Sequence, residues 1–315
     1  MQAKQLQKQL ETLNPADSIS YKKLLNRPQY GVNRFNAQLN GISQVEFLGL
    51  RFHRMTQSKA IETILDLVAS DDGYRVFFVN AHSIEVAQRN QTLSGALQRS
   101  HLLLADGSGV LWGSHLMGKS LNYNLNGTDL IPALCKTGGA KGLSVYFLGA
   151  KPGIAERAAK NLANLSPGMK VAGYREGYFD KADTEVVLQN IRAAKPDVLL
   201  VAMGTPLQEI WIDQYASQLP GIICLGVGGL FDFAAGEVTR APLWVRSLGF
   251  EWLWRLLVEP KRLWKRYTLG NIVYIRLLLK ARVQKTWRTL QIVLVSTIER
   301  LLLSLGNSKV NDSDS

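Results

Sequence analysis

The 315-residue sequence contains few cysteines and histidines, and no apolar run approaches membrane-spanning length. The two cysteines, Cys135 and Cys224, lie in apolar stretches, which favours buried free thiols in the reducing cytosol over disulfide bonds. The four histidines lack the spacing of metal ligands, so we expect no metal site. Residues 1–13 are polar, so we also expect no signal peptide. These absences favour a cytoplasmic chain that does not cross a bilayer.

Several signatures of nucleotide or nucleophile chemistry are incomplete. Segment 113–120 matches G-x-x-x-x-G-K-S, but a predicted helix precedes it where a P-loop needs a strand. We therefore interpret the match, which includes Lys119, as coincidental. The glycine-rich segment 226–229 lacks the last glycine of a dinucleotide fingerprint, because Phe231 stands there. No serine or cysteine lies in a nucleophile elbow, so we expect acid–base assisted transfer without a metal.

Positive charge is concentrated in one part of the chain. The net charge is +12, and residues 240–288 alone hold twelve Lys or Arg against two acidic residues, a net charge of +10. Five of the seven tryptophans lie in the same segment, namely Trp244, Trp252, Trp254, Trp264 and Trp287. Basic residues interleaved with tryptophan favour binding to an anionic membrane surface, with nucleic acid as the alternative.

Apolar runs of strand length alternate with helical periodicity between residues 45 and 240. Strands are expected at 45–55, 76–79, 102–105, 144–148, 170–172, 198–203 and 222–225. Helices are expected between them, among others at 56–69, 83–97, 110–117, 128–135, 184–194 and 206–219. This alternation predicts an α/β fold with a Rossmann-like, mostly parallel sheet flanked by helices.

The pattern changes after Arg240. An amphipathic helix is expected over residues 243–258, followed by a break at Pro260 and a second helix from residue 261. After an interruption near Gly270, a third helix is expected over 272–303. We thus divide the chain into a polar extension (1–44), an α/β domain (45–240), a basic, Trp-rich, membrane-associating helical appendage (241–303) and a polar tail (304–315).

Polar side chains follow four of the predicted strands: Asn80, Asp106, Gln208 and Asp232. Open α/β sheets bind ligands at the carboxyl ends of their strands, so we expect these side chains to converge there. Asp106 has two interpretations, an N-cap of the following helix or a partly buried general base. The glycine-rich segment 226–229 favours close approach of a phosphate over a plain turn. His82 lies near a strand end, where it could contact a ligand.

Together these segments resemble the WecG/TagA/CpsF glycosyltransferase family from about residue 45 to residue 267. The similarity is carried by residues 80–83 (NAHS), 105–107 (ADG), 126–130 (NGTDL), 204–209 (GTPLQE), 226–232 (GVGGLFD), 240–242 (RAP), 251–253 (EWL) and 259–263 (EPKRL). The sequence departs from the family pattern at Asn124, where members often have arginine, and at Phe78, where many have threonine.

The resemblance implies a metal-independent, inverting enzyme that uses no cofactor. It would transfer a sugar, such as N-acetylmannosamine or a related hexose, from a UDP-sugar to a polyprenyl-diphosphate-linked saccharide for cell-surface polysaccharide. It assigns the catalytic base to Asp106 and functional roles to Gln208 and Asp232. We expect further substrate contacts from Asn80, His82, Asn124, Gly204, Gly228, Gly229 and Arg240.

Arg255, Arg262 and Arg266 are candidates to bind diphosphate or membrane lipid. The enzyme is expected to be peripheral on the inner face of the cell membrane, and self-association into a homo-oligomer stays open. Other nucleotide-dependent α/β enzymes and a non-catalytic membrane- or nucleic-acid-binding protein are the alternatives.

Overall fold

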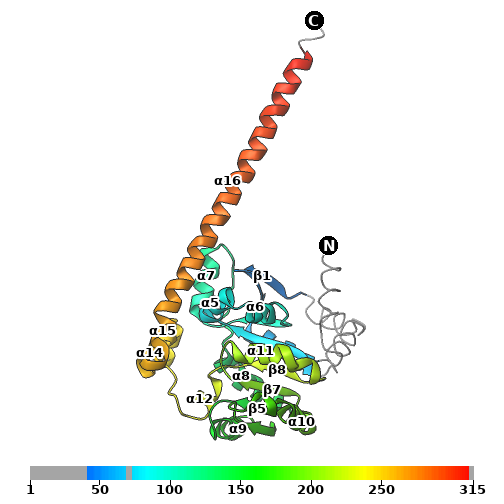
Figure 1. Cartoon of the computed structure of the whole chain (residues 1–315), viewed down its shortest axis with the longest axis vertical. Coiled ribbons are helices and arrows are strands. Elements are labelled where there is room, and N and C mark those ends of the chain that lie inside the picture. The colour runs from blue at the N-terminus through cyan, green and yellow to red at the C-terminus, as the bar shows by residue number, and fades with distance from the viewer. Residues whose placement is uncertain (1–40, 69–72, 312–315) are drawn as a thin grey trace. The chain divides into compact units, whose positions relative to one another are not determined.

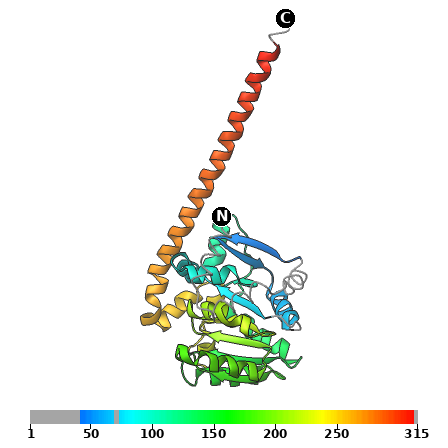
Figure 2. The same ribbon diagram turned by 45° about the vertical axis from the view of Figure 1, so that its right-hand side comes forward.

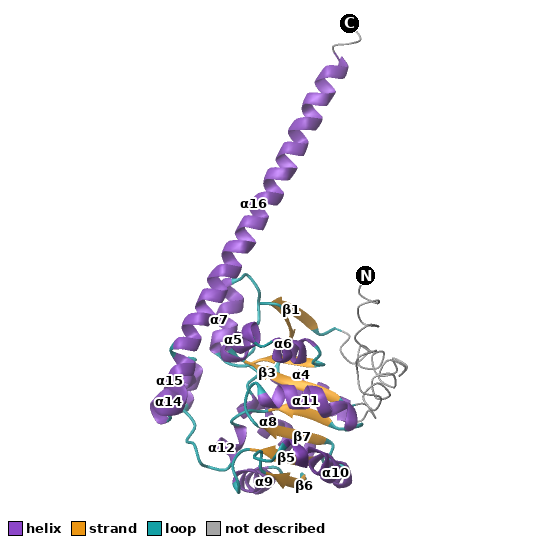
Figure 3. Ribbon diagram, viewed as in Figure 1, coloured by secondary structure: helices purple, strands orange, loops and turns teal. Residues whose placement is uncertain are grey.

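A computed structural model describes residues 41–68 and 73–311. Most of the predicted polar extension, up to residue 40, and the last four residues of the tail lie outside the described residues. The centre of the fold is a six-stranded parallel sheet with the order β4-β3-β8-β7-β5-β6 (Figure 3). Its strands are β3 (Tyr74–Val79), β4 (Leu102–Ala105), β5 (Ser144–Gly149), β6 (Lys170–Arg175), β7 (Val198–Ala202) and β8 (Ile223–Gly226). The predicted Rossmann-like α/β fold is confirmed.

Helices flank this sheet, and a short antiparallel hairpin of β1 (Ser43–Phe47) and β2 (Leu50–Arg54) precedes it (Figure 1). The flanking helices are α4 (Gln57–Val68), α5 (Ala81–Arg89), α6 (Gln91–Gln98), α7 (Ser108–Leu116), α8 (Gly127–Gly139), α9 (Ile154–Leu165), α10 (Thr184–Ala194), α11 (Leu207–Tyr215) and α12 (Leu230–Ala234). The strands β4, β7 and β8 are buried along their whole length, as expected for parallel strands covered on both faces.

Capping side chains explain two differences from the predicted helices. The single helix expected over 83–97 is two helices, because Asn90 accepts a hydrogen bond from the Leu93 amide (3.0 Å) and starts α6. The helix expected from Thr128 begins instead at Gly127, because the side chain of Asn126 accepts a hydrogen bond from the Asp129 amide (2.8 Å). Helical periodicity alone did not distinguish these caps from helix interior.

The C-terminal part forms four helices: α13 (Leu243–Ser247), α14 (Glu251–Val258), α15 (Pro260–Tyr267) and α16 (Leu269–Asn311). The single helix predicted over 243–258 is wrong, because Gly249 has φ +77°, a left-handed conformation that ends a helix. The predicted break at Pro260 is confirmed, because α15 begins there. The interruption predicted near Gly270 is also confirmed, and Thr268 is the residue between α15 and α16. The last helix continues past residue 303, to Asn311.

The first part of α16 packs on α5 and contacts α7 at the side of the α/β domain (Figure 2). The hydroxyl of Tyr274 donates to the carbonyl of Gly109 (3.1 Å), and Tyr274 and Leu278 are buried. A Cβ on Gly113 would lie 2.4 Å from the Tyr274 hydroxyl, so a glycine there permits the close approach of the two helices. Among the described residues, no helix is both long and apolar enough to span a membrane.

Candidate active site

A cavity of about 1270 Å³ opens at the carboxyl ends of the parallel strands. The loops after β3, β4, β7 and β8 line one side of it, and helices α13 to α16 supply side chains opposite. All but one of the predicted site residues line this cavity: Asn80, His82, Asp106, Asn124, Gly204, Gln208, Gly228, Gly229, Asp232, Arg255, Arg262 and Arg266. The sheet topology thus brings together residues that are far apart in sequence, as the strand-end rule requires.

Asp106 lies directly after β4, and its carboxyl faces the cavity rather than the following helix. The N-cap position of α7 is occupied by Gly107, so the interpretation of Asp106 as a helix cap is wrong. Burial raises the pKa of Asp106, and the hydrogen bond from Asn80 and the charge of Arg266 oppose that rise. A carboxylate of raised pKa in a cavity has the properties of a general base.

Asn80 both caps helix α5 and hydrogen-bonds the carboxylate of Asp106. Its side-chain oxygen accepts a hydrogen bond from the Ser83 amide (3.1 Å) and so caps α5. Its side-chain nitrogen donates to Oδ2 of Asp106 at 3.4 Å. Because the cap fixes the amide orientation, Asn80 positions the Asp106 carboxylate.

Asn124 holds the turn that follows Asp106. Its side-chain oxygen accepts a hydrogen bond from the amide of Gly107 at 2.7 Å. Gly107 has φ +90°, a conformation that side chains rarely tolerate. Asn124 therefore stabilises the turn between the acid and α7.

Gln208 joins the two glycine loops at the sheet edge. Its side-chain oxygen accepts hydrogen bonds from the amides of Gly204 (3.2 Å) and Gly228 (2.9 Å). Its nitrogen donates to Glu209 (2.9 Å), whose pKa is raised by burial. These contacts occupy the Gln208 oxygen, so in this structure the residue positions the loops that face the cavity.

Arginines from α14 and α15 make the opposite wall basic. Arg262 pairs with Asp232 (3.5 Å) and with Glu259 (2.7 Å), and the Arg255 guanidinium lies 5.0 Å from the Phe233 ring centroid. Arg266 is half-buried, and desolvation lowers its pKa. Within the described part of the chain, the buried Nε atoms of Arg255 and Arg266 have no hydrogen-bond partner. The wall therefore has unsatisfied cationic donors, which suits an anionic ligand.

His82 lies close to the same arginine. Burial, together with the charges of Arg266 and Arg89, lowers the pKa of His82 to about 4. The imidazole is consequently neutral at physiological pH and can donate or accept a hydrogen bond without adding charge.

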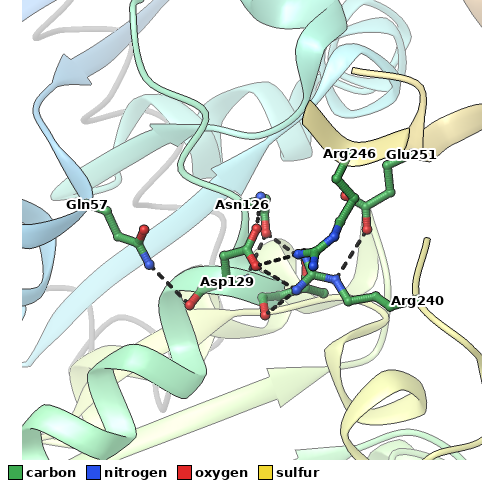
Figure 4. Close-up of polar contacts among 7 residues, drawn as sticks. Gln57, Asn126, Asp129, Arg240, Arg246 and Glu251 are labelled. Atoms are coloured by element: carbon green, nitrogen blue, oxygen red, sulfur yellow. Dashed lines mark hydrogen bonds and ion pairs between the residues drawn. The ribbon is translucent and has the colours of Figure 1, made fainter. Parts of the chain in front are cut away.

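Arg240, the remaining predicted site residue, does not line the cavity. Its guanidinium donates to Asp129 (2.6 Å) and to Glu251 (3.4 Å), and Arg246 donates to the same Asp129 oxygen at 3.2 Å (Figure 4). Asp129 also accepts a hydrogen bond from Asn126 (2.8 Å). This cluster, formed by Asn126, Asp129, Arg240, Arg246 and Glu251, connects the start of α8 to the segment that enters the C-terminal helices.

Three members of the cluster, Asn126, Arg246 and Glu251, line the cavity, as do Lys151 and Tyr178 from the loops after β5 and β6. None of these five was predicted as a site residue, because no local pattern marks a side chain that reaches the site from a distant element. Lys119 and the segment 113–120 do not form a P-loop, since Gly113 lies inside α7. In the described ranges, no group of three His, Cys, Asp or Glu side chains is placed to hold a metal ion.

Comparison with known proteins identifies the class to which this fold and site belong. The Glycosyl transferase WecG/TagA/CpsF family model matches residues 45–288, so the chain belongs to this family and is a glycosyltransferase. Among its relatives are proteins from Staphylococcus aureus strains COL and MRSA252, each named N-acetylglucosaminyldiphosphoundecaprenol N-acetyl-beta-D-mannosaminyltransferase. Each is 30% identical over 234 residues, which is 74% of this chain and 91% of the relative.

Proposed function

We propose that this protein transfers N-acetylmannosamine, or a related hexose, from a UDP-sugar to a polyprenyl-diphosphate-linked saccharide in the synthesis of cell-surface polysaccharide. The names of the relatives support the sugar and the acceptor class. The observation that carries the proposal is the pairing of a half-buried carboxylate, Asp106, with a basic wall in one cavity. Transfer between two diphosphate-bearing substrates needs both a base and cationic groups.

Asp106 acts as the general base in this proposal. Its carboxylate takes the proton from the acceptor hydroxyl, whose oxygen then attacks the anomeric carbon as the bond to UDP breaks. Because attack and departure occur on opposite faces, the anomeric configuration inverts. Asn80 and Asn124 hold the carboxylate and the adjoining turn in place through hydrogen bonds of 3.4 and 2.7 Å.

The negative charge that develops on the departing UDP is stabilised by arginines rather than by a metal ion. Arg246, Arg255, Arg262 and Arg266 all line the cavity. Three of them, Arg246, Arg255 and Arg266, have buried Nε atoms without hydrogen-bond partners among the described residues, and such unsatisfied donors suit phosphate oxygens. The glycine loops at Gly204 and Gly228 allow a nucleotide to approach the backbone closely.

The protein acts as a peripheral enzyme on the inner face of the cell membrane. Exposed tryptophans at 244, 264 and 287 accompany the basic residues of the C-terminal helices. Tryptophan and basic side chains together favour the interface of anionic lipid. The division into an α/β domain and a membrane-associating appendage belongs to this proposal.

The test is transfer by the full-length protein in detergent. It is incubated with undecaprenyl-diphosphate-linked N-acetylglucosamine and, in separate reactions, UDP-N-acetylmannosamine, UDP-N-acetylglucosamine or UDP-glucose. Mass spectrometry is expected to show a lipid-linked disaccharide with one of these donors, formed equally well in the presence of EDTA. Absence of product with every donor would overturn the proposal, and loss of product with EDTA would overturn its metal-independent part.

A further inference from the structure

One end of the cavity is apolar, and this end follows the seam between α7 and α16. On α7, Ser108, Trp112 and Leu116 line the cavity at intervals of four residues. This spacing places them on one face of the helix, which leads away from Asp106. From Ser108 to Leu116 the rise of an α-helix covers about 12 Å. The face thus changes from polar beside the acid to apolar at its far end.

The adjoining helix shows the same change. On α16, Asn271, Ile275 and Leu278 line the cavity, again at helical spacing. The two helices run in the same direction. Tyr274 donates to the carbonyl of Gly109 (3.1 Å), and eleven residues further along α16, Lys285 donates to the carbonyl of Met117 (3.0 Å).

Apolar side chains along this seam are exposed within the described part of the chain. Trp112 is 55% exposed, and Ile275 is 52% exposed. Tyr274 and Leu278, on the same helix as Ile275, are buried. Trp112 lies beside the turn at Gly249, where an added Cβ would lie 3.4 Å from the indole ring. An exposed aromatic group beside an apolar strip that lines a cavity is typical of a ligand site.

We propose that this strip, formed by Trp112, Leu116 and Ile275, binds the isoprenoid chain of the acceptor next to its diphosphate. The inference rests on the proposed function. The occupant must be anionic at one end and linear and apolar beyond it, because the strip is continuous with the cavity that holds Asp106 and the arginines. A polyprenyl diphosphate has this chemistry, with the diphosphate facing Arg262 and Arg266 and the first isoprene units along the strip.

This placement makes the strip a determinant of acceptor specificity. A saccharide diphosphate without an isoprenoid chain would reach Asp106 and the arginines but would leave the apolar strip exposed to water. The chain contributes binding in proportion to the apolar area that it covers. Since its contacts are far from the reacting atoms, the chain is expected to lower the KM for acceptor with little change in kcat.

The experiment compares three forms of diphosphate-linked N-acetylglucosamine, bearing an undecaprenyl, a geranyl or a methyl group, with full-length protein in one detergent. The wild type is expected to use the geranyl acceptor with a KM about tenfold or more below that of the methyl acceptor. Trp112→Ala and Ile275→Ser are each expected to remove most of this difference and to leave turnover of the methyl acceptor unchanged. Trp287→Ala is the matched control, because Trp287 is exposed on α16 but does not line the cavity.

Equal KM values for the geranyl and methyl acceptors in the wild type would overturn the inference. So would an equal effect of Trp287→Ala, which would indicate general association with detergent or lipid. A parallel loss with all three acceptors in both strip variants would also overturn it, since that result indicates damage to the fold. Transfer to the methyl acceptor tests the proposed function separately, so failure of the strip leaves that function standing.

Discussion

Asp106 is a carboxylate whose surroundings favour its neutral form. Burial raises its pKa, whereas the hydrogen bond from Asn80 and the charge of Arg266 lower it, and the rise prevails. The neighbouring residues limit the rise without cancelling it. A carboxylate with a raised pKa is a stronger base than an ordinary aspartate, and it keeps its proton up to a higher pH.

Replacement of Asp106 by asparagine tests its role as base. We expect Asp106→Asn to lower kcat by about 10²–10⁴-fold, because the amide cannot accept the proton of the acceptor hydroxyl. In the wild type the rate is expected to fall as the pH drops through the pKa of Asp106, which lies above its ordinary 3.8. The pH–rate profile of the variant's residual activity should lack this fall. Near-normal turnover by folded Asp106→Asn would contradict the assignment.

The substitution Asp106→Asn is also expected to leave the stability of the folded protein unchanged or to raise it. The folded-state pKa of Asp106 is above the unfolded value, so ionisation of this group favours the unfolded state once the pH exceeds the unfolded pKa. Asp106→Asn is therefore expected to unfold at the same or a higher temperature than the wild type at pH 7, with a difference that disappears below about pH 4. Thermal unfolding at both pH values checks this. Asp183→Asn, at an exposed position, is the control. A lower midpoint for Asp106→Asn at pH 7 would contradict the prediction.

At the scale of elements, two of the contacts that attach the C-terminal helices to the α/β domain stand out. One is the cluster around Asp129 (Figure 4), and the other is the packing of α16 on α7 at Gly113. Both influence which side chains line the cavity, since Arg246, Glu251 and Ile275 come from the attached segments. The two contacts are separable by mutation.

Asp129→Asn tests the cluster. Burial would raise the pKa of Asp129, but hydrogen bonds from Arg240 and Asn126 lower it below 3.8. Loss of this carboxylate leaves two arginines without their shared acceptor, and we expect a cost of about 1–2 kcal/mol, reduced by partial exposure. Cleavage by trypsin within residues 236–250 should become faster. The contribution of the wild-type carboxylate is present above the unfolded pKa and is lost as the pH falls through its lowered folded-state pKa.

Glu185→Gln provides the comparison for that variant. Glu185 pairs with Arg192 at 2.6 Å on the exposed surface of α10, away from the cluster. We expect its loss to change stability by less than about 0.5 kcal/mol and to leave trypsin cleavage of 236–250 unchanged. Similar behaviour of the two variants would contradict a specific role for Asp129.

Gly113→Val tests the packing of α16 on α7. An added Cβ at this position would meet the Tyr274 hydroxyl at 2.4 Å and the Phe47 ring at 3.0 Å. We expect a loss of about 1–3 kcal/mol, measured by urea unfolding, although valine is a better helix former than glycine. Gly109→Ala is the matched control on the same helix, because its Cβ meets only Ala81, at 3.4 Å. A loss for Gly109→Ala as large as that for Gly113→Val would show that the effect is not specific to the contact with α16.

At the scale of the whole molecule, positive charge and apolar exposure coincide on the C-terminal helices. Residues 240–288 carry a net charge of +10, and exposed side chains in this region include Trp244, Trp264 and Ile272. An anionic lipid surface attracts each Lys or Arg near it by about 1 kcal/mol, and salt screens this attraction. Association with such a surface would bring the cavity to the plane in which a lipid-linked acceptor lies.

Neutralising three exposed cations tests this association. The triple variant Lys261→Gln, Arg276→Gln and Lys280→Gln is expected to bind anionic vesicles about 100-fold more weakly at low salt, as measured by sedimentation. Its control is Lys136→Gln, Lys141→Gln and Lys170→Gln, which removes the same charge from exposed positions in the α/β domain. Equal weakening in both variants would show that net charge, and not the C-terminal surface, determines binding.

Local patterns in the sequence determined the fold class and predicted twelve of the residues that line the cavity. Apolar runs of strand length, ended by Asn80 and Asp106, predicted a parallel sheet with polar residues at one edge, and the structure has that arrangement. This succeeded because buried parallel strands have a simple composition and all end at the same edge. Helix boundaries at Asn90 and Gly249 were not predicted, since one capping or left-handed residue ends a helix within an unchanged apolar periodicity.

Only the tertiary structure decided which distant side chains meet. Arg240 was predicted to contact substrate, yet it pairs with Asp129, 111 residues away, and Arg246 faces the cavity instead. The apolar strip likewise depends on the alignment of Trp112 with Ile275, two residues on helices that are separated by most of the α/β domain. The physical reason is range: periodicity and capping act over a few residues, whereas ion pairs and helix packing depend on how whole elements dock.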